Sequence, residues 1–239
     1  MLFTDVIGRL EAGLRGELPG ASAQARLAPI PRRDWPSGLN PARVRNAAGL
    51  LLVFPERTGN AKAATTAKED SSLRSSRSVR ESAGEAHVVL TVRADSLGRH
   101  GGQVSLPGGV VERGETFEQA ALRESHEEIA LAVNEVRVLG ALTPIDIPVS
   151  GFRLHPIVAV VDRPPLLTPT DGEVAEVLEI PVHALLDRRN LRSNERVRDG
   201  LPLVVPTFHV AHHEIWGATA MVLAEFLTIL GWGRSHVHE

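Results

Sequence analysis

The chain contains no cysteine and no tyrosine, and each absence removes a class of chemistry. Without cysteine there can be no disulfide framework, thiolate zinc site or cysteine nucleophile. Without tyrosine there is no phenolic acid or base. The longest mostly apolar stretch, residues 218–232, is interrupted by Thr219, Glu225 and Thr228 and is too short to cross a bilayer. The first residues lack the basic region of a secretory signal, so we expect a cytoplasmic protein with no membrane partner.

The net charge is also small, but it is unevenly distributed along the chain. The net charge is −3 over 239 residues, which gives no reason to expect nucleic-acid binding. Residues 107–131 hold six glutamates against two arginines, so this segment carries −4 and the rest of the chain +1. The acidic character of the protein therefore lies in one short segment, while the 43% hydrophobic content is ample for a core.

The composition divides the chain into three parts. Residues 1–42 are predicted to form an N-terminal helix and a proline-rich connector, 43–230 the main domain, and 231–239 a C-terminal tail. Residues 56–86 have only two large apolar side chains, Leu73 and Val79, among six Ser, six Ala and eleven charged residues. Such a segment cannot bury enough surface to offset its ordering entropy, so we predict a flexible insertion within the domain.

Hydrophobic periodicity predicts a mixed fold. Short apolar or β-branched runs indicate strands at 47–54, 87–93, 136–142, 156–161 and 203–209, the first two paired. Helices are expected at 117–131, 182–186 and 219–230. The spacing is not the regular alternation of a doubly wound sheet, so we expect an α+β or α/β/α sandwich with a mixed sheet.

The helix expected from residue 117 concentrates carboxylates on one face. Thr116 and Gln119 have the spacing of a capping box, which places the helix start. At about 100° per residue, Glu124, Glu127 and Glu128 fall on one face. Phe117, Ala121, Leu122 and Ile129 lie opposite and are expected to pack on the sheet. Hard divalent cations prefer clustered carboxylates, and the preceding Gly108-Gly109 lets backbone approach an ion or a phosphate.

These residues resemble the Nudix box of diphosphate hydrolases: Gly109, Glu115, then Arg123-Glu124-x-x-Glu127-Glu128. The resemblance implies a Nudix-like α/β/α sandwich and a Mg²⁺- or Mn²⁺-dependent enzyme. It implies that Glu124, Glu127 and Glu128 bind metal, with a carbonyl of Gly108 or Gly109 as a further ligand and Glu128 essential. Arg123 would orient the glutamates and Glu115 would pair with it. Ser125 and Ala130 replace the usual aliphatic and glycine; we expect Ser125 to bond the Ala121 carbonyl and Ala130 to alter the helix exit slightly.

A second motif bears on the substrate. Leu90-Thr91-x-Arg93-Ala94, then Gly102 and Leu106-Pro107-Gly108-Gly109, resembles the signature of the coenzyme A diphosphatase branch. That signature usually has Arg at Gly98 and Phe at Leu106; Arg99 and His100 stand close by. The resemblance implies hydrolysis of coenzyme A or acyl-coenzyme A to 3′,5′-ADP and 4′-phosphopantetheine. Arg93, with Arg99 or His100, would meet the 3′-phosphate or the diphosphate, although Arg93 can also be a strand-end charge.

Several assignments stay open at this stage. Glu173 and Glu176 are both candidates for the general base, and Glu173 is better placed because it follows a turn. ADP-ribose or another nucleoside diphosphate derivative is an alternative substrate, and a nucleotide-sensing Nudix module is a non-catalytic alternative. The histidines of His209-x-x-His212-His213 are expected to be ordinary surface residues, and residues 215–220 a packing element. A homodimer is a further expectation.

Overall fold

The computed structural model describes residues 1–57, 84–95, 101–170, 172–198 and 200–233. Most of the predicted insertion, and both Arg99 and His100, therefore lie outside the described residues. Among the described residues, no helix is long and apolar enough to cross a membrane.

A mixed sheet of eight strands forms the centre of the molecule. Strand β1 (Arg45–Pro55) runs parallel to β7 (Phe152–Val160) and antiparallel to β2 (Ala86–Arg93) and β4 (Gly108–Val110). The sheet is completed by β3 (Val104–Ser105), β5 (Arg137–Ala141), β6 (Ile145–Ile147) and β8 (Val174–Pro181). The predicted pairing of the first two strands is confirmed, since Val53 lies opposite Val88.

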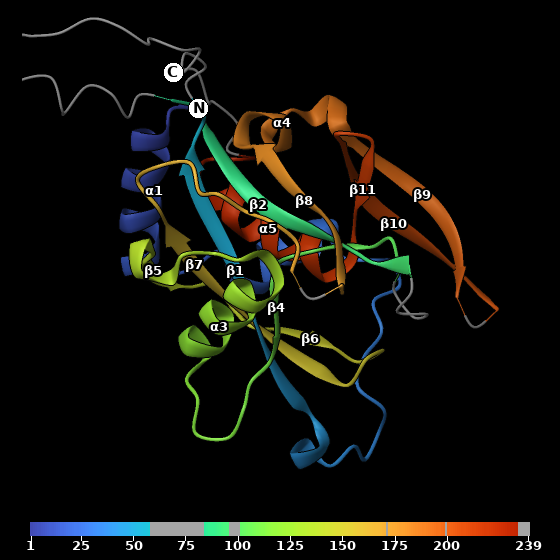
Figure 1. Ribbon diagram of the computed structural model, residues 1–239. Coiled ribbons are helices and arrows are strands. Elements are labelled where there is room, and N and C mark those ends of the chain that lie inside the picture. Colours follow the sequence, from blue (N-terminus) through green and yellow to red (C-terminus); the bar gives the residue numbers. More distant parts are fainter. Residues whose placement is uncertain (58–83, 96–100, 171, 199, 234–239) are drawn as a thin grey trace, which may run out of the picture.

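Alternation along β1 separates two hydrophobic layers. Leu51 and Val53 face one side, where they pack in one core with helices α1 (Phe3–Arg15) and α5 (Gly217–Ile229). Leu50, Leu52 and Phe54 face the other side, where they pack against α3 (Phe117–Ile129). Successive strand residues point to opposite faces, so one apolar strand serves both layers. Figure 1 shows α3 and α5 on either side of this sheet. The predicted α/β/α sandwich is confirmed.

A second, smaller sheet lies beside the first and reaches the proline-rich connector. It consists of β9 (Leu191–Arg198), β10 (Leu201–Val210) and β11 (His213–Ile215), all antiparallel (Figure 1). Ile30 of the connector exchanges two backbone hydrogen bonds with Val204 of β10, both 2.8 Å long. The connector therefore continues the edge of this sheet for one residue pair before the chain returns to β1.

The remaining elements join the layers. Helix α4 (Val182–Leu186) follows β8 as predicted, and α2 (Gly20–Gln24) packs against α5. Short 3₁₀ turns occupy Ala25–Leu27, Pro41–Arg43, Val133–Glu135 and Arg188–Asn190. Glu225 of α5 is fully buried and accepts hydrogen bonds from Gly20 N, Gln24 Nε2 and Thr143 Oγ1. This carboxylate ties α2 and the β5–β6 loop to α5.

Some predicted boundaries are wrong. The strand expected at 156–161 begins at Phe152, because it pairs with β1 from Arg45 to Val53. Ala86, assigned to the insertion, belongs to β2. Phe117 was expected to pack on the sheet, but it is 38% exposed and stacks on His155 with ring centroids 3.6 Å apart. Of the expected tail, residues 231–233 are described, and Trp232 is buried there against Phe208.

Candidate active site

Local interactions define both ends of helix α3. At its start the predicted capping box is present, with Thr116 Oγ1 accepting from Gln119 N and Gln119 Oε1 accepting from Thr116 N. At its end Ala130 adopts the left-handed conformation, with φ 55° and ψ 30°. Alanine therefore takes up the backbone geometry that glycine favours. The Ser125 hydroxyl donates to the Ala121 carbonyl at 2.7 Å, as predicted.

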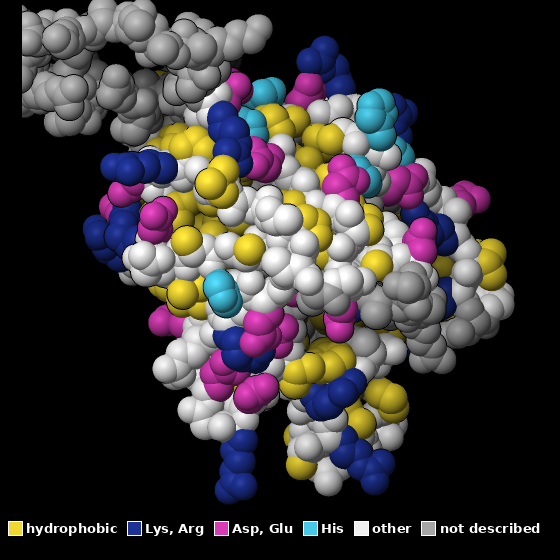
Figure 2. All heavy atoms as spheres, in the orientation of Figure 1, with side chains coloured by type: hydrophobic (Ala, Val, Ile, Leu, Met, Phe, Trp, Pro, Cys, Tyr) yellow, Lys and Arg dark blue, Asp and Glu magenta, His cyan; other side chains and the backbone are white. Residues whose placement is uncertain are grey.

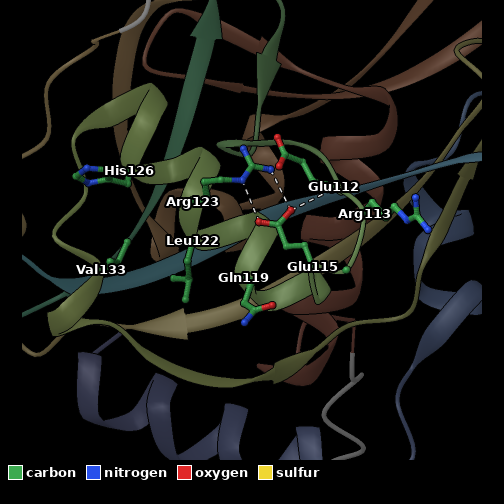
Figure 3. Close-up of a pocket in the computed structure, with 9 residues that line it drawn as sticks. Glu112, Arg113, Glu115, Gln119, Leu122, Arg123, His126 and Val133 are labelled. Atoms are coloured by element: carbon green, nitrogen blue, oxygen red, sulfur yellow. Dashed lines mark hydrogen bonds and ion pairs between the residues drawn. The ribbon is translucent and has the colours of Figure 1, made fainter.

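Arg123 on this helix is the centre of a carboxylate cluster, and Figure 3 shows its pairing with Glu115, which lies just before the helix. Its guanidinium donates two hydrogen bonds to Glu115, of 2.9 and 3.1 Å, and this pairing was predicted. It also donates to Glu124 and Glu127 at 3.0 Å each and to the Val110 carbonyl at 3.1 Å. The Arg123 hydrogen bonds lower the pKa of Glu115 below its ordinary value. Figure 2 shows acidic and basic side chains gathered over α3.

Glu124 and Glu128 line a cavity of about 820 Å³ between α3, the sheet and the smaller sheet. Glu128 is only 5% exposed, and its Oε2 accepts a 2.9 Å hydrogen bond from Gly108 N. Burial raises the pKa of Glu124, and its hydrogen bond from Arg123 acts in the opposite direction. Both carboxylates therefore line one cavity, where partial exclusion of water favours the binding of a cation.

The two glycines of β4 make room for this arrangement. A Cβ on Gly109 would lie 2.4 Å from the carboxyl carbon of Glu124, so the carboxylate occupies the place of a side chain. Gly108 has φ 151°, and a Cβ there would lie 2.2 Å from the Ala48 carbonyl oxygen. Gly108 is required by the backbone of β1 and Gly109 by the carboxylate of Glu124.

Comparison with known proteins identifies the family of this site. A family model described as the NUDIX domain matches residues 76–199, slightly more than half of the chain. The chain belongs to the Nudix family. It is a hydrolase that acts on the diphosphate bond of a nucleoside diphosphate derivative.

Curated relatives and a solved structure agree with this assignment. A protein of Enterobacter sp. named uncharacterized Nudix hydrolase NudL is 33% identical over 145 residues, covering 60% of this chain and 75% of the relative. Its namesake in Yersinia pestis is 36% identical over 140 residues, covering 58% and 70%. The fold resembles the crystal structure of the Nudix hydrolase RenU of M. smegmatis, with a TM-score of 0.50, 20% identity and coverage of 82% and 91%.

Nudix hydrolases generally use divalent metals, and the donor set here fits one. Carboxylate oxygens of Glu124 and Glu128 line the same hollow beside the glycine backbone, and Mg²⁺ typically takes few protein ligands and keeps several waters. Glu127 is more exposed, at 54% of its side chain, and is held by Arg123. Among the described residues, no three His, Asp or Glu side chains already stand together as a metal-binding group. In this arrangement the Glu127 carboxylate is engaged by Arg123.

Arg93 and Glu173, predicted separately from distant parts of the chain, lie together in the Nudix cavity. Arg93 Nη2 is 3.3 Å from Glu173 Oε2, and both side chains line the hollow. The loop before Glu173 is attached to the last turn of α3, because Thr170 N donates to the Glu128 carbonyl at 3.1 Å. Glu176, the other candidate base, lies on β8 with its carboxylate 3.3 Å from His213 Nε2.

The expected surface histidines belong to the smaller sheet. His209 contacts Thr207 on β10, and His213 contacts Glu176, at 3.0 and 3.3 Å. The segment after them, predicted to be a packing element, also reaches the site. Thr219 Oγ1 donates to the Val104 carbonyl at 3.0 Å, and both Trp216 and Thr219 line the cavity.

Four charged residues of the cavity wall escaped sequence reasoning: Arg32, Arg33, Asp146 and Arg198. None belongs to a recognisable motif, and the three arginines come from the connector and the β9–β10 hairpin. The bridge between Ile30 and Val204 joins the connector, which carries Arg32 and Arg33, to β10 beside the cavity. The proline-rich composition of the connector gave no signal of this role.

Proposed function

We propose that this Nudix hydrolase cleaves the diphosphate of coenzyme A or acyl-coenzyme A, giving 3′,5′-ADP and the corresponding 4′-phosphopantetheine. Mg²⁺ or Mn²⁺ would be held by Glu124, Glu127 and Glu128. The proposal rests mainly on one observation: Glu124, Glu128, the Gly108–Gly109 backbone and Arg93 all line the same cavity. These are residues of both the Nudix box and the second motif. The predicted cytoplasmic location and homodimer stay predictions.

Each residue would have a distinct task. A bound cation supplies neutralisation of the diphosphate oxygens, without which attack by water on so anionic a group is unfavourable. Arg123 fixes Glu124 and Glu127 by direct hydrogen bonds of 3.0 Å. Gly108 N holds the buried Glu128 carboxylate in one orientation. These contacts reduce the reorganisation needed when substrate arrives.

Glu173 and Arg93 would act on the other side of the diphosphate. Their 3.3 Å ion pair lines the cavity, so the guanidinium can bind an anionic oxygen through charge-assisted hydrogen bonds. The Glu173 carboxylate lies beside the guanidinium on the cavity wall and would accept a proton from the attacking water. Glu176 is less suited to this task because its carboxylate is beside His213.

The test is a product-resolved panel of coenzyme A, acetyl-coenzyme A, ADP-ribose, dinucleoside polyphosphates and 8-oxo-nucleotides, with Mg²⁺, with Mn²⁺ and with chelator. We expect the highest kcat/KM for coenzyme A or its thioester and no turnover with chelator. A strong preference for a substrate without pantetheine would refute the substrate assignment. Binding of nucleotides without hydrolysis of any compound would favour the sensing module.

A pair of isosteric variants tests the site itself. Glu128→Gln is expected to lower kcat by orders of magnitude while the protein stays folded, because one carboxylate ligand is lost. Glu118→Gln is the matched control, since Glu118 is exposed in the first turn of the same helix. A folded Glu128→Gln protein with near-normal turnover would overturn the assignment.

A further inference from the structure

The segment that begins helix α5 has a place in the cavity wall but no task in the proposed reaction. Trp216 and Thr219, both from the stretch expected to be a packing element, line the same hollow as Glu124 and Gly108. Trp216 is partly exposed, so its indole ring offers surface to the cavity. Of the described residues on the wall, only Phe152 is also aromatic. A partly exposed aromatic ring in a cavity is a typical contact for a flat ligand.

Charged neighbours hold the Trp216 ring from behind. The Arg196 guanidinium lies over the ring, with its carbon 4.5 Å from the ring centroid, a cation–π distance. Arg196 is not among the described residues that line the cavity, so it covers the ring from outside the hollow. Arg196 is in turn paired with Glu214, which also accepts a 3.1 Å hydrogen bond from Asn194 Nδ2. These contacts join β9 and β11 to the indole and restrict its orientation before any ligand binds.

The backbone around Trp216 is fixed as well. Trp216 lies between β11 and α5, with the last residue of β11 on one side and the first of α5 on the other. Three residues on, Thr219 Oγ1 donates to the Val104 carbonyl at 3.0 Å. Val104 comes only four residues before Gly108, so the start of α5 and the Gly108–Gly109 backbone are tied to one short stretch of chain. A ligand that contacts both would meet two features whose separation the fold fixes.

We propose that Trp216 is the platform on which the purine base of the substrate stacks while its diphosphate lies at the glutamates of α3. The inference deepens the proposed function and rests on it for the position of the diphosphate. A base is the occupant because the substrate is a nucleoside diphosphate derivative, whose flat aromatic part is its base. Bases stack on aromatic side chains through their π faces, and a ring already held by Arg196 loses little conformational freedom on binding.

The test is titration with AMP and with ribose 5-phosphate, which lacks the base, followed by tryptophan fluorescence and by calorimetry. A purine stacked on Trp216 should quench part of the fluorescence of wild type, and ribose 5-phosphate should not. Trp216→Leu should weaken AMP binding by about tenfold or more, the usual worth of one base–aromatic stack. Trp216→Phe keeps an aromatic face without an indole, so it should lose the quench and keep AMP affinity within about threefold of wild type.

A second tryptophan supplies the matched control. Trp232 is buried, lies outside the described cavity wall and packs on Phe208, so Trp232→Phe should bind AMP as wild type does. On the best substrate of the panel, Trp216→Leu should raise KM by about tenfold and leave kcat within about twofold. The base takes no part in the bond that is cleaved, so its contact contributes to binding alone.

Three results would each overturn the platform: no binding of AMP to wild type, AMP affinity unchanged in Trp216→Leu, or equal losses of affinity for AMP and ribose 5-phosphate. Loss of AMP affinity in Phe152→Leu but not in Trp216→Leu would also refute it, because the base would then lie on the other ring. The proposed substrate fails separately. If coenzyme A and its thioesters are not hydrolysed, but AMP still quenches wild type and not Trp216→Phe, the platform stands without that substrate. Hydrolysis of coenzyme A with AMP affinity unchanged in Trp216→Leu keeps the substrate and refutes the platform.

Discussion

Replacing Gly109 by alanine should damage the active site without damaging the fold. The new methyl group would lie 2.4 Å from the Glu124 carboxyl carbon and 2.5 Å from both its oxygens. An ordinary contact needs about 3.4 Å or more, so the carboxylate must retreat by about 1 Å. It is the far end of a flexible side chain, so the move costs little stability. A misplacement of about 1 Å can nevertheless lower kcat by about 100-fold.

Two other glycines supply matched controls for the same substitution. Gly108→Ala would place its Cβ 2.2 Å from the Ala48 carbonyl oxygen and 2.6 Å from Gly49 Cα. Both are backbone atoms of β1, so relieving the clash would disturb the strand. We expect the substitution to lower the free energy of unfolding by at least about 2 kcal/mol. Gly8 lies within α1, and a Cβ there would meet no atom within 4 Å. Gly8→Ala should therefore leave kcat unchanged and raise the free energy of unfolding by up to about 1 kcal/mol.

The assay is kcat on the preferred substrate together with urea denaturation for all three variants. The reasoning predicts a separation: Gly109→Ala loses turnover, Gly108→Ala loses stability, and Gly8→Ala loses neither. A Gly109→Ala protein with the kcat of wild type would refute it, because Glu124 would then not be needed where the structure holds it.

Three further substitutions test the packing around the site. Ala130→Gly should raise the free energy of unfolding by about 1 kcal/mol in urea denaturation, because Ala130 is held at φ 55°; unchanged stability would contradict this. Glu225→Ala should lower the free energy of unfolding by about 3–5 kcal/mol in the same assay, about 1–2 kcal/mol for each of the donors of Gly20, Gln24 and Thr143 that loses its acceptor. A loss below about 1 kcal/mol would count against that network. Burial lowers the pKa of His155, so its contribution to stability is full above about pH 6.5 and falls as pH drops toward the folded pKa. His155→Phe should therefore lose less stability than wild type between pH 7 and 5, and equal losses would refute it.

Local signals made the Nudix helix predictable. The capping box, the periodic apolar face and the Glu115–Arg123 spacing all depend on residues within about 15 positions, so sequence distance and spatial distance agree there. The same holds for the Ser125 bond to Ala121, one helical turn away. The conformation of Ala130 was harder to predict. We expected a different end to the helix because alanine usually avoids the left-handed region, yet Ala130 adopts it. The hydrogen bonds from Ala130 N to the carbonyls of the last helical turn outweighed that local preference.

Elements formed by distant partners were not predictable from periodicity. Strand β4 has only three residues, two of them glycine, and exists because β1 pairs with it. Strand β9 alternates weakly, with no fully buried residue, and is defined by its register with β10. The cavity follows the same rule. Arg32 and Arg33 line it beside the bridge between Ile30 and Val204, a pairing that no motif in the connector predicts.

The acidic excess of residues 107–131 overstates the negative charge that faces the cavity. Arg123 bonds three of the six glutamates at once, so Glu115, Glu124 and Glu127 share one cation within the helix itself. Glu128 accepts a hydrogen bond from the backbone N–H of Gly108. A divalent cation held as we propose would have to compete with Arg123 for Glu124 and Glu127. Because Arg123 pairs with these three carboxylates, it reduces the repulsion between them, and we expect the acidic helix to fold before any metal binds.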